Sequence, residues 1–140
     1  MEVVDLRPKL MSLRTTSFHG ENKAASSGTE PWTIQLTQTI EVGLAVAQDP
    51  ASSLQAVVKI ELIAHATKSD AEDQKANFSG SYEAKFEYPE GATEPQISPL
   101  FEREPYQYVL VAQAFPLAMT HFRREMQSMG FDARELPLGI

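Results

Sequence analysis

Three histidines, His19, His65 and His121, are the side chains of this 140-residue sequence best suited to acid–base or metal chemistry. Metal sites built on histidine use ligands at short regular spacings, or histidine together with cysteines and carboxylates. Each of the three histidines falls in a different expected element, and no two have such a spacing. We therefore expect structural or surface roles for them and predict no metal site.

Two serine pairs and one acidic cluster are the remaining candidates for chemistry. Ser26-Ser27-Gly28 and Ser52-Ser53 lack the strand–turn–helix context of a nucleophile elbow, and the sequence has no glycine-rich phosphate loop. Asp70, Glu72 and Asp73 lack the glycine and the final glutamate of a calcium-binding loop. The sequence thus offers no catalytic constellation and no cofactor motif, which favours a protein that is not an enzyme.

Composition narrows the remaining functions. The sequence is 42% hydrophobic and 22% charged, which is ordinary for a globular protein, and its length predicts one domain over residues 1–140. A net charge of −7 disfavours nucleic acid and anionic membranes as partners. The absence of cysteine excludes disulfides and thiolate chemistry. With neither a signal peptide nor an apolar span visible, we expect a cytoplasmic protein.

Alternating apolar and polar residues predict the strands that would position any site. Residues 3 to 18 form a first strand, which Pro8 places at the edge of a sheet. Residues 20 to 31 are rich in turn-forming residues and predict a long exposed loop. Alternation then predicts strands over residues 32 to 46, about 58 to 66 and 78 to 88, with a charged loop over residues 67 to 75. The short connections between the last three strands predict an antiparallel meander.

One long segment must cover the apolar face of this sheet. Residues 89 to 105 contain four prolines and one glycine and predict no regular structure, which leaves residues 105 to 130 as the cover. After Pro116 the apolar residues form a single helical stripe that ends at Gly130. Before Pro116 apolar residues lie on all sides, which fits either a buried strand or a helix that a partner subunit also covers. The predicted fold class is α+β: a four-stranded antiparallel sheet followed by one long proline-kinked helix.

Trp32 lies between the predicted long loop and the clearest predicted strand. A single tryptophan in this position can be a core anchor, or it can be an exposed aromatic side chain that binds other molecules. Both interpretations remain open on composition and periodicity.

The order of these segments resembles the SecB family of protein-export chaperones. In that family a long crossover loop leads into an alternating strand, as the segment before Trp32 does here. The motif Phe115-Pro116-Leu117-Ala118-Met119, followed by a helix to Gly130 and a proline-containing tail, is similar to the family's Phe-Pro-Tyr-Ala-Arg helix. The tyrosine and arginine of that motif are replaced by leucine and methionine. The family continues with a further helix and often an acidic tail, and this sequence resembles a shortened, divergent member.

The resemblance implies a homotetramer, a dimer of dimers in which the helices are sandwiched between two sheets. The implied oligomer interface involves Tyr108, Val111, Phe115 and Phe122. The implied binding site for unfolded polypeptide involves Trp32, Ile34 and Leu36. Acidic residues on the exposed face of the sheet, Glu83 and Glu87, would correspond to a docking site for the translocation ATPase.

Two functional hypotheses follow. The first is an ATP-independent chaperone, a holdase that binds non-native polypeptides along hydrophobic grooves, with a role in protein export. The second is a dedicated adaptor, of the kind that accompanies toxin–antitoxin pairs, which holds one specific protein partner.

Overall fold

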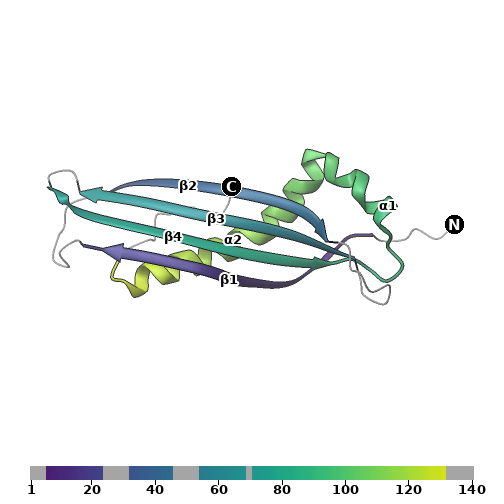
Figure 1. Ribbon diagram of the computed structural model, residues 1–140, viewed down its shortest axis with the longest axis horizontal. Helices are drawn as coiled ribbons and strands as arrows, with labels where there is room; N and C mark the ends of the chain where they lie inside the picture. The colour runs from purple at the N-terminus through teal and green to yellow at the C-terminus, as the bar shows by residue number, and fades with distance from the viewer. Residues whose placement is uncertain (1–5, 24–31, 46–53, 69–70, 132–140) are drawn as a thin grey trace.

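The computed structural model describes residues 6–23, 32–45, 54–68 and 71–131. Four long strands form one elongated sheet, and a long helix crosses one face of it (Figure 1). The strands are β1 (Lys9–Asn22), β2 (Trp32–Ala45), β3 (Gln55–Lys68) and β4 (Ala71–Glu87). After them come the short helix α1 (Glu94–Ile97), the 3₁₀ helix η1 (Ser98–Glu102) and the long helix α2 (Glu104–Ser128). The predicted α+β fold class is confirmed.

The order of strands across the sheet is β1-β4-β3-β2, and all three neighbouring pairs are antiparallel. Strands β2, β3 and β4 form the predicted meander. Strand β1 lies at the edge beside β4, which confirms the edge position indicated by Pro8. Consecutive strands β1 and β2 therefore lie at opposite edges of the sheet.

Period-two alternation gives the sheet one apolar face and one polar face. The even-numbered residues from Ala56 to Ala66 in β3 and from Ala76 to Phe86 in β4 are buried, among them Ile60, Leu62, Phe78, Tyr82 and Phe86. Their odd-numbered neighbours point to the other side and are rich in Thr, Ser, Lys and Glu. We call this polar side the open face. Helix α2 covers the apolar side.

Helix α2 runs diagonally from the β2 edge to the β1 edge (Figure 1). Near its start, Val111 lies beside Ile40 and Val42 of β2. Near its end, the Phe122 ring packs against Phe18 of β1 with ring centroids 6.1 Å apart. Just beyond the helix, the side-chain amide of Asn22 donates a hydrogen bond of 3.0 Å to the carbonyl oxygen of Met129. The diagonal path leaves the β2 side of the apolar face partly uncovered.

Residues 106–114, which the sequence left between strand and helix, are helical. The apolar residues of this half do not need burial on all sides. Leu110, Val111, Ala114 and Phe115 face the sheet and are buried, whereas Tyr108 and Val109 are more than half exposed. In the second half the predicted stripe is confirmed, because Ala118, Met119, Phe122 and Met126 are all buried.

The helix continues through Pro116, which has no N–H to donate to the preceding turn. The Thr120 hydroxyl donates a hydrogen bond of 2.8 Å to the Pro116 carbonyl, one turn earlier in the helix. Gly130 ends the helical region with a φ of 81°, as predicted. The Gly130 and Phe131 amides bond back to the carbonyls of Gln127 and Met126.

The prediction that residues 89 to 105 lack regular structure is wrong, because α1 and η1 lie there. Pro95 and Pro99 each occupy the first turn of a helix, where a missing N–H costs no hydrogen bond. The Gln96 side chain accepts a hydrogen bond from the Thr93 amide, which stabilises the start of α1. Ile97 anchors the short helix in the core.

Two predicted loop boundaries are also wrong. Strand β1 extends to Asn22 and so includes Gly20, which the sequence assigned to a loop. This glycine serves close packing and not a turn, because a Cβ atom there would collide with Met129 and Phe78. The charged segment 67–75 also contributes to β3 and β4, whose backbones pair as far as Lys68 and Ala71. The charged side chains of this segment therefore do not prevent its backbone from pairing as a strand.

Candidate functional site

An apolar groove lies between strand β2 and the first turns of α2. It has a volume of ≈ 760 Å³. Ile40 and Val42 form its strand wall, and Pro105, Tyr108 and Val109 contribute to its helix wall. Tyr108 is 56% exposed and Val109 is 55% exposed, so large apolar side chains at this site are accessible to another molecule. We call this site the β2–α2 groove.

The groove continues a strip of partly buried apolar side chains along β2. Ile34 and Leu36, predicted to bind polypeptide, belong to this strip together with Ile40, Val42 and Leu44. Ile34 and Leu36 pair in register with Ala66 and Ala64 of β3, whose small side chains leave them room against the core. The backbone of Trp32 begins β2 opposite Lys68, but the Trp32 side chain lies outside the described residues.

Backbone geometry distinguishes β2 from the other edge strand. All 14 residues of β2 pair with β3 without a register shift, and Glu41 is the strand's single charged residue. Among the described residues no strand pairs with the outer edge of β2. Strand β1 carries Lys9, Arg14 and Glu21, and its register with β4 shifts twice. Charges and bulges are the devices that block pairing with a further strand, so the edge of β2 is the more receptive of the two.

The four residues predicted for an oligomer interface do not share one surface. Phe115 and Phe122 are fully buried within their own chain, and Val111 is 7% exposed. Only Tyr108 of the four presents an extensive surface to another subunit. It is joined on the exposed side of α2 by Val109 and by Leu117, which is 42% exposed. The sequence missed Val109 and Leu117, although they lie on the helical side away from the buried stripe.

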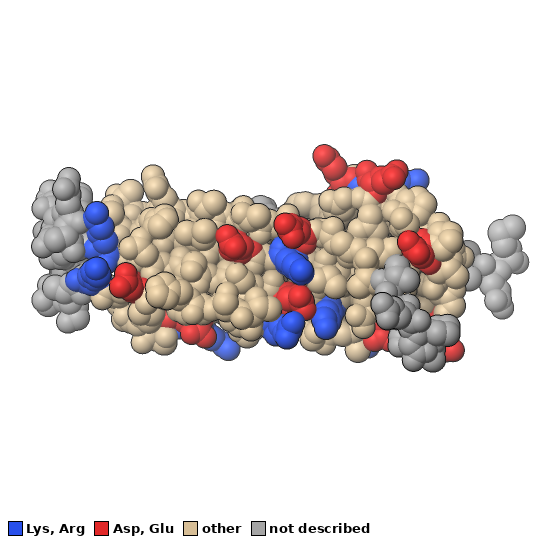
Figure 2. Space-filling model, in the orientation of Figure 1, with Lys and Arg blue, Asp and Glu red and all other residues tan. Residues whose placement is uncertain are grey.

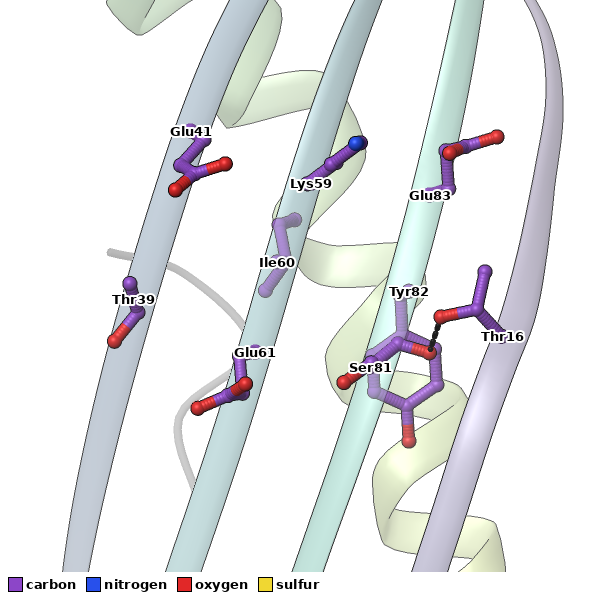
Figure 3. Close-up of a pocket in the computed structure, with 9 residues that line it drawn as sticks. All are labelled: Thr16, Thr39, Glu41, Lys59, Ile60, Glu61, Ser81, Tyr82 and Glu83. Carbon is purple, nitrogen blue, oxygen red and sulfur yellow. Dashed lines mark hydrogen bonds between the residues drawn. The ribbon is translucent and has the colours of Figure 1, made fainter.

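Glu83 and Glu87, the predicted docking acids, lie on the open face within a mixture of charges. Glu83 is engaged by Arg14, whose guanidinium nitrogen lies 3.2 Å from the carboxylate oxygen. Glu87 is in register with Lys9 of β1. A shallow hollow of ≈ 380 Å³ on this face is lined by both Glu41 and Lys59 (Figure 3). The open face is therefore not a continuous acidic patch.

Two buried tyrosines, Tyr88 and Tyr82, differ in whether their hydroxyl groups have a hydrogen-bond partner. The hydroxyls of Tyr88, at the end of β4, and Tyr106, in the first turn of α2, lie 2.5 Å apart. Burial, followed by this hydrogen bond, raises the pKa of Tyr88 far above the ordinary tyrosine value. The Tyr82 hydroxyl is buried with no hydrogen-bond partner among the described residues. Burial, followed by the negative charge of Glu125, raises the pKa of Tyr82.

The described residues contain neither a metal-binding cluster nor a membrane helix. In the described ranges no three His, Cys, Asp or Glu side chains lie close enough to hold a metal ion. No helix in the same ranges has the length and apolarity needed to cross a membrane.

The strand order and the long helix across one face define a SecB-like fold. The Mycobacterium tuberculosis Rv1957 SecB-like chaperone, solved in complex with a ChAD peptide from the Rv1956 HigA1 antitoxin, has a similar structure. The TM-score is 0.65 at 16% sequence identity, and the match covers 94% of this chain and 90% of that chain. No protein-family model matches the chain, and no curated protein matches it in sequence.

Proposed function

We propose that this protein is an ATP-independent holdase that binds non-native polypeptide in an extended conformation at the β2–α2 groove. The observation that carries the proposal is the combination of an exposed apolar groove with a regular strand edge that no other described strand pairs with. It is a non-enzymatic function, since binding alone is required. In keeping with a cysteine-free sequence, we place the protein in the cytoplasm.

The physical argument is that an extended chain can satisfy both parts of the site at once. Its backbone can pair with the outer edge of β2, and alternate side chains can enter the groove beside Tyr108 and Val109. Backbone pairing does not depend on side-chain identity, and an apolar groove discriminates weakly between apolar residues. Both properties suit binding of many unfolded sequences.

The experiment is suppression of aggregation of a chemically denatured client. The protein should suppress aggregation at near-stoichiometric amounts without ATP. Val109→Asp should weaken suppression about tenfold, because a carboxylate must be desolvated in the groove. Met11→Asp, at an apolar residue of β1 that is as exposed as Val109, is the matched control and should behave as the unmodified protein. Equal activity of the two variants would remove the groove from the proposal.

A dedicated adaptor for one partner is the second candidate. It is supported by the similar Rv1957 chaperone, which was solved with an antitoxin peptide. Affinity capture from a lysate separates the candidates, because a holdase recovers many unrelated chains and an adaptor recovers one. Val109→Asp should abolish either pattern of recovery.

The proposal includes a homotetramer whose contacts use the exposed side of α2. Leu117, an exposed apolar side chain two turns beyond the groove, would be covered by a second subunit, whereas Tyr108 and Val109 would stay accessible to the client. Docking on the translocation ATPase is not included, because Glu83 already pairs with Arg14 and the open face is mixed in charge.

A further inference from the structure

A row of alternating charges crosses the open face perpendicular to the strands. Register pairs Arg14 with Glu83, Glu83 with Lys59, and Lys59 with Glu41. Each strand thus contributes one charge, in the order plus, minus, plus, minus from β1 to β2. Figure 2 views this face and shows blue and red atoms alternating in a column near its centre. Figure 3 shows Glu41, Lys59 and Glu83 side by side on neighbouring strands.

The order of these four charges is antisymmetric about the middle of the row. A two-fold axis parallel to the strands, lying between β4 and β3, would place a second copy face to face with the first. Arg14 would then face Glu41 of the other copy, and Glu83 would face Lys59. A two-fold axis along the row would instead oppose each charge to its own kind, so only the first arrangement is complementary.

The rest of the open face agrees with the same arrangement. Glu61 would face Ser81, and Lys85 would face Val57. Glu87 would face Gln55, so no like charges meet in these rows. Three strands have 14 residues and the fourth has 17, so the face measures about 46 by 19 Å, or about 900 Å² per copy. Two such faces would bury an area typical of a specific protein interface.

We propose that the open face is a self-association surface on which a second copy docks by this charge row. The contact is separate from the groove and from the exposed side of α2. Because mostly polar and charged side chains meet, association is weak and sensitive to salt. If oligomers form through α2, the open-face contact would join one such oligomer to another.

The test uses charge reversal in matched pairs, with mass measured by sedimentation at low and high salt. In a dimer of Lys59→Glu, the new glutamate of each copy faces Glu83 of the other copy. In a dimer of Glu83→Lys, the new lysine of each copy faces Lys59 of the other copy. Each should weaken association about tenfold or more. Mixed in equal amounts, the two variants oppose only unlike charges and should associate again. Arg103→Glu and Glu102→Lys, exposed residues outside the open face, are the controls and should leave association unchanged.

Cross-linking tests the orientation independently. The sequence contains no cysteine, so Thr16→Cys and Thr39→Cys can be combined in one chain. These residues lie on β1 and β2, at opposite edges of the sheet. They face each other only between copies, at the spacing of about 10 Å expected for packed sheets. A thiol cross-linker of about that length should yield covalent dimers at low salt.

Three results would overturn the proposal. The first is a mass that does not change between low and high salt. The second is a mixture of Lys59→Glu and Glu83→Lys that stays as dissociated as either variant alone, which would assign the row to stability within one chain. The third is a Thr16→Cys/Thr39→Cys protein that gives no cross-linked dimer although it sediments as an associated species.

Discussion

Gly80 and Gly43 show how differently two glycines in one sheet constrain the protein. A Cβ atom at Gly80 would lie 2.5 Å from the Tyr82 hydroxyl and 2.8 Å from its ring, whereas a Cβ at Gly43 would meet nothing within 4 Å. Gly80→Ala should therefore lower the free energy of unfolding by about 1–3 kcal/mol through overpacking. Gly43→Ala should change it by less than about 0.5 kcal/mol. Urea denaturation of both variants measures the difference, and equal midpoints would contradict this packing.

Removing the hydroxyl group from Tyr88 or from Tyr82 should change stability in different ways. Tyr88→Phe leaves the Tyr106 hydroxyl without its partner and should cost about 1 kcal/mol of stability. Tyr82→Phe removes a buried hydroxyl that has no partner among the described residues, so stability should stay equal or rise. The midpoints of urea denaturation rank the two variants, and a larger loss for Tyr82→Phe would reveal a missing partner.

The two sides of helix α2 have different roles: the buried side stabilises the single chain, and the exposed side is the proposed contact with another subunit. Phe115 is fully buried against the sheet, so Phe115→Ala should lower the free energy of unfolding by about 3–5 kcal/mol. Leu117 is 42% exposed, so Leu117→Ala should change unfolding of the single chain by less than about 0.5 kcal/mol. Leu117→Ala should instead raise the concentration needed for oligomer formation. Denaturation and light scattering on both variants test this, and a Leu117→Ala protein with unchanged association would exclude this side of α2.

The sequence predicted the elements whose position depends on a local pattern of residues. Strict alternation located β2 to within a residue, and Pro8 indicated an edge strand correctly. Residues 106–114 were ambiguous because Tyr and Val are compatible with both strand and helix, and the tertiary contact of Leu110 and Ala114 decides between them. Residues 94–102 were missed because their prolines were counted as breakers, although proline is compatible with the first turn of a helix.

The candidate site was predicted in part for the same reason. Ile34 and Leu36 follow from the alternation of a single strand. The helix wall of the groove, Tyr108 and Val109, depends on the diagonal crossing of α2 over the sheet, which no local pattern encodes. The charge row depends on three strand registers at once, because Arg14 and Glu41 are distant in sequence and lie on opposite edges.

For the whole molecule, the proposed homotetramer has a defined mass. Light scattering at high salt, where the open-face contact is screened, should give about 62 kDa, four times the 15.5 kDa chain. A mass of a single chain under these conditions would contradict the tetramer. The proposal for the β2–α2 groove would still be tested by Val109→Asp, because this groove lies within a single chain.

The strand order also has a consequence for synthesis on the ribosome. Strand β1 is made first, but its neighbour β4 is made last, with Asn22 pairing to Ala76 and Lys9 to Glu87. At about 5–20 residues per second, β1 waits roughly 3 to 15 s for its partner. The hairpins β2–β3 and β3–β4 need no such wait, so they form the platform onto which β1 docks. The charges and bulges of β1 are features that oppose pairing with a wrong strand, and we expect them to protect the nascent chain during this interval.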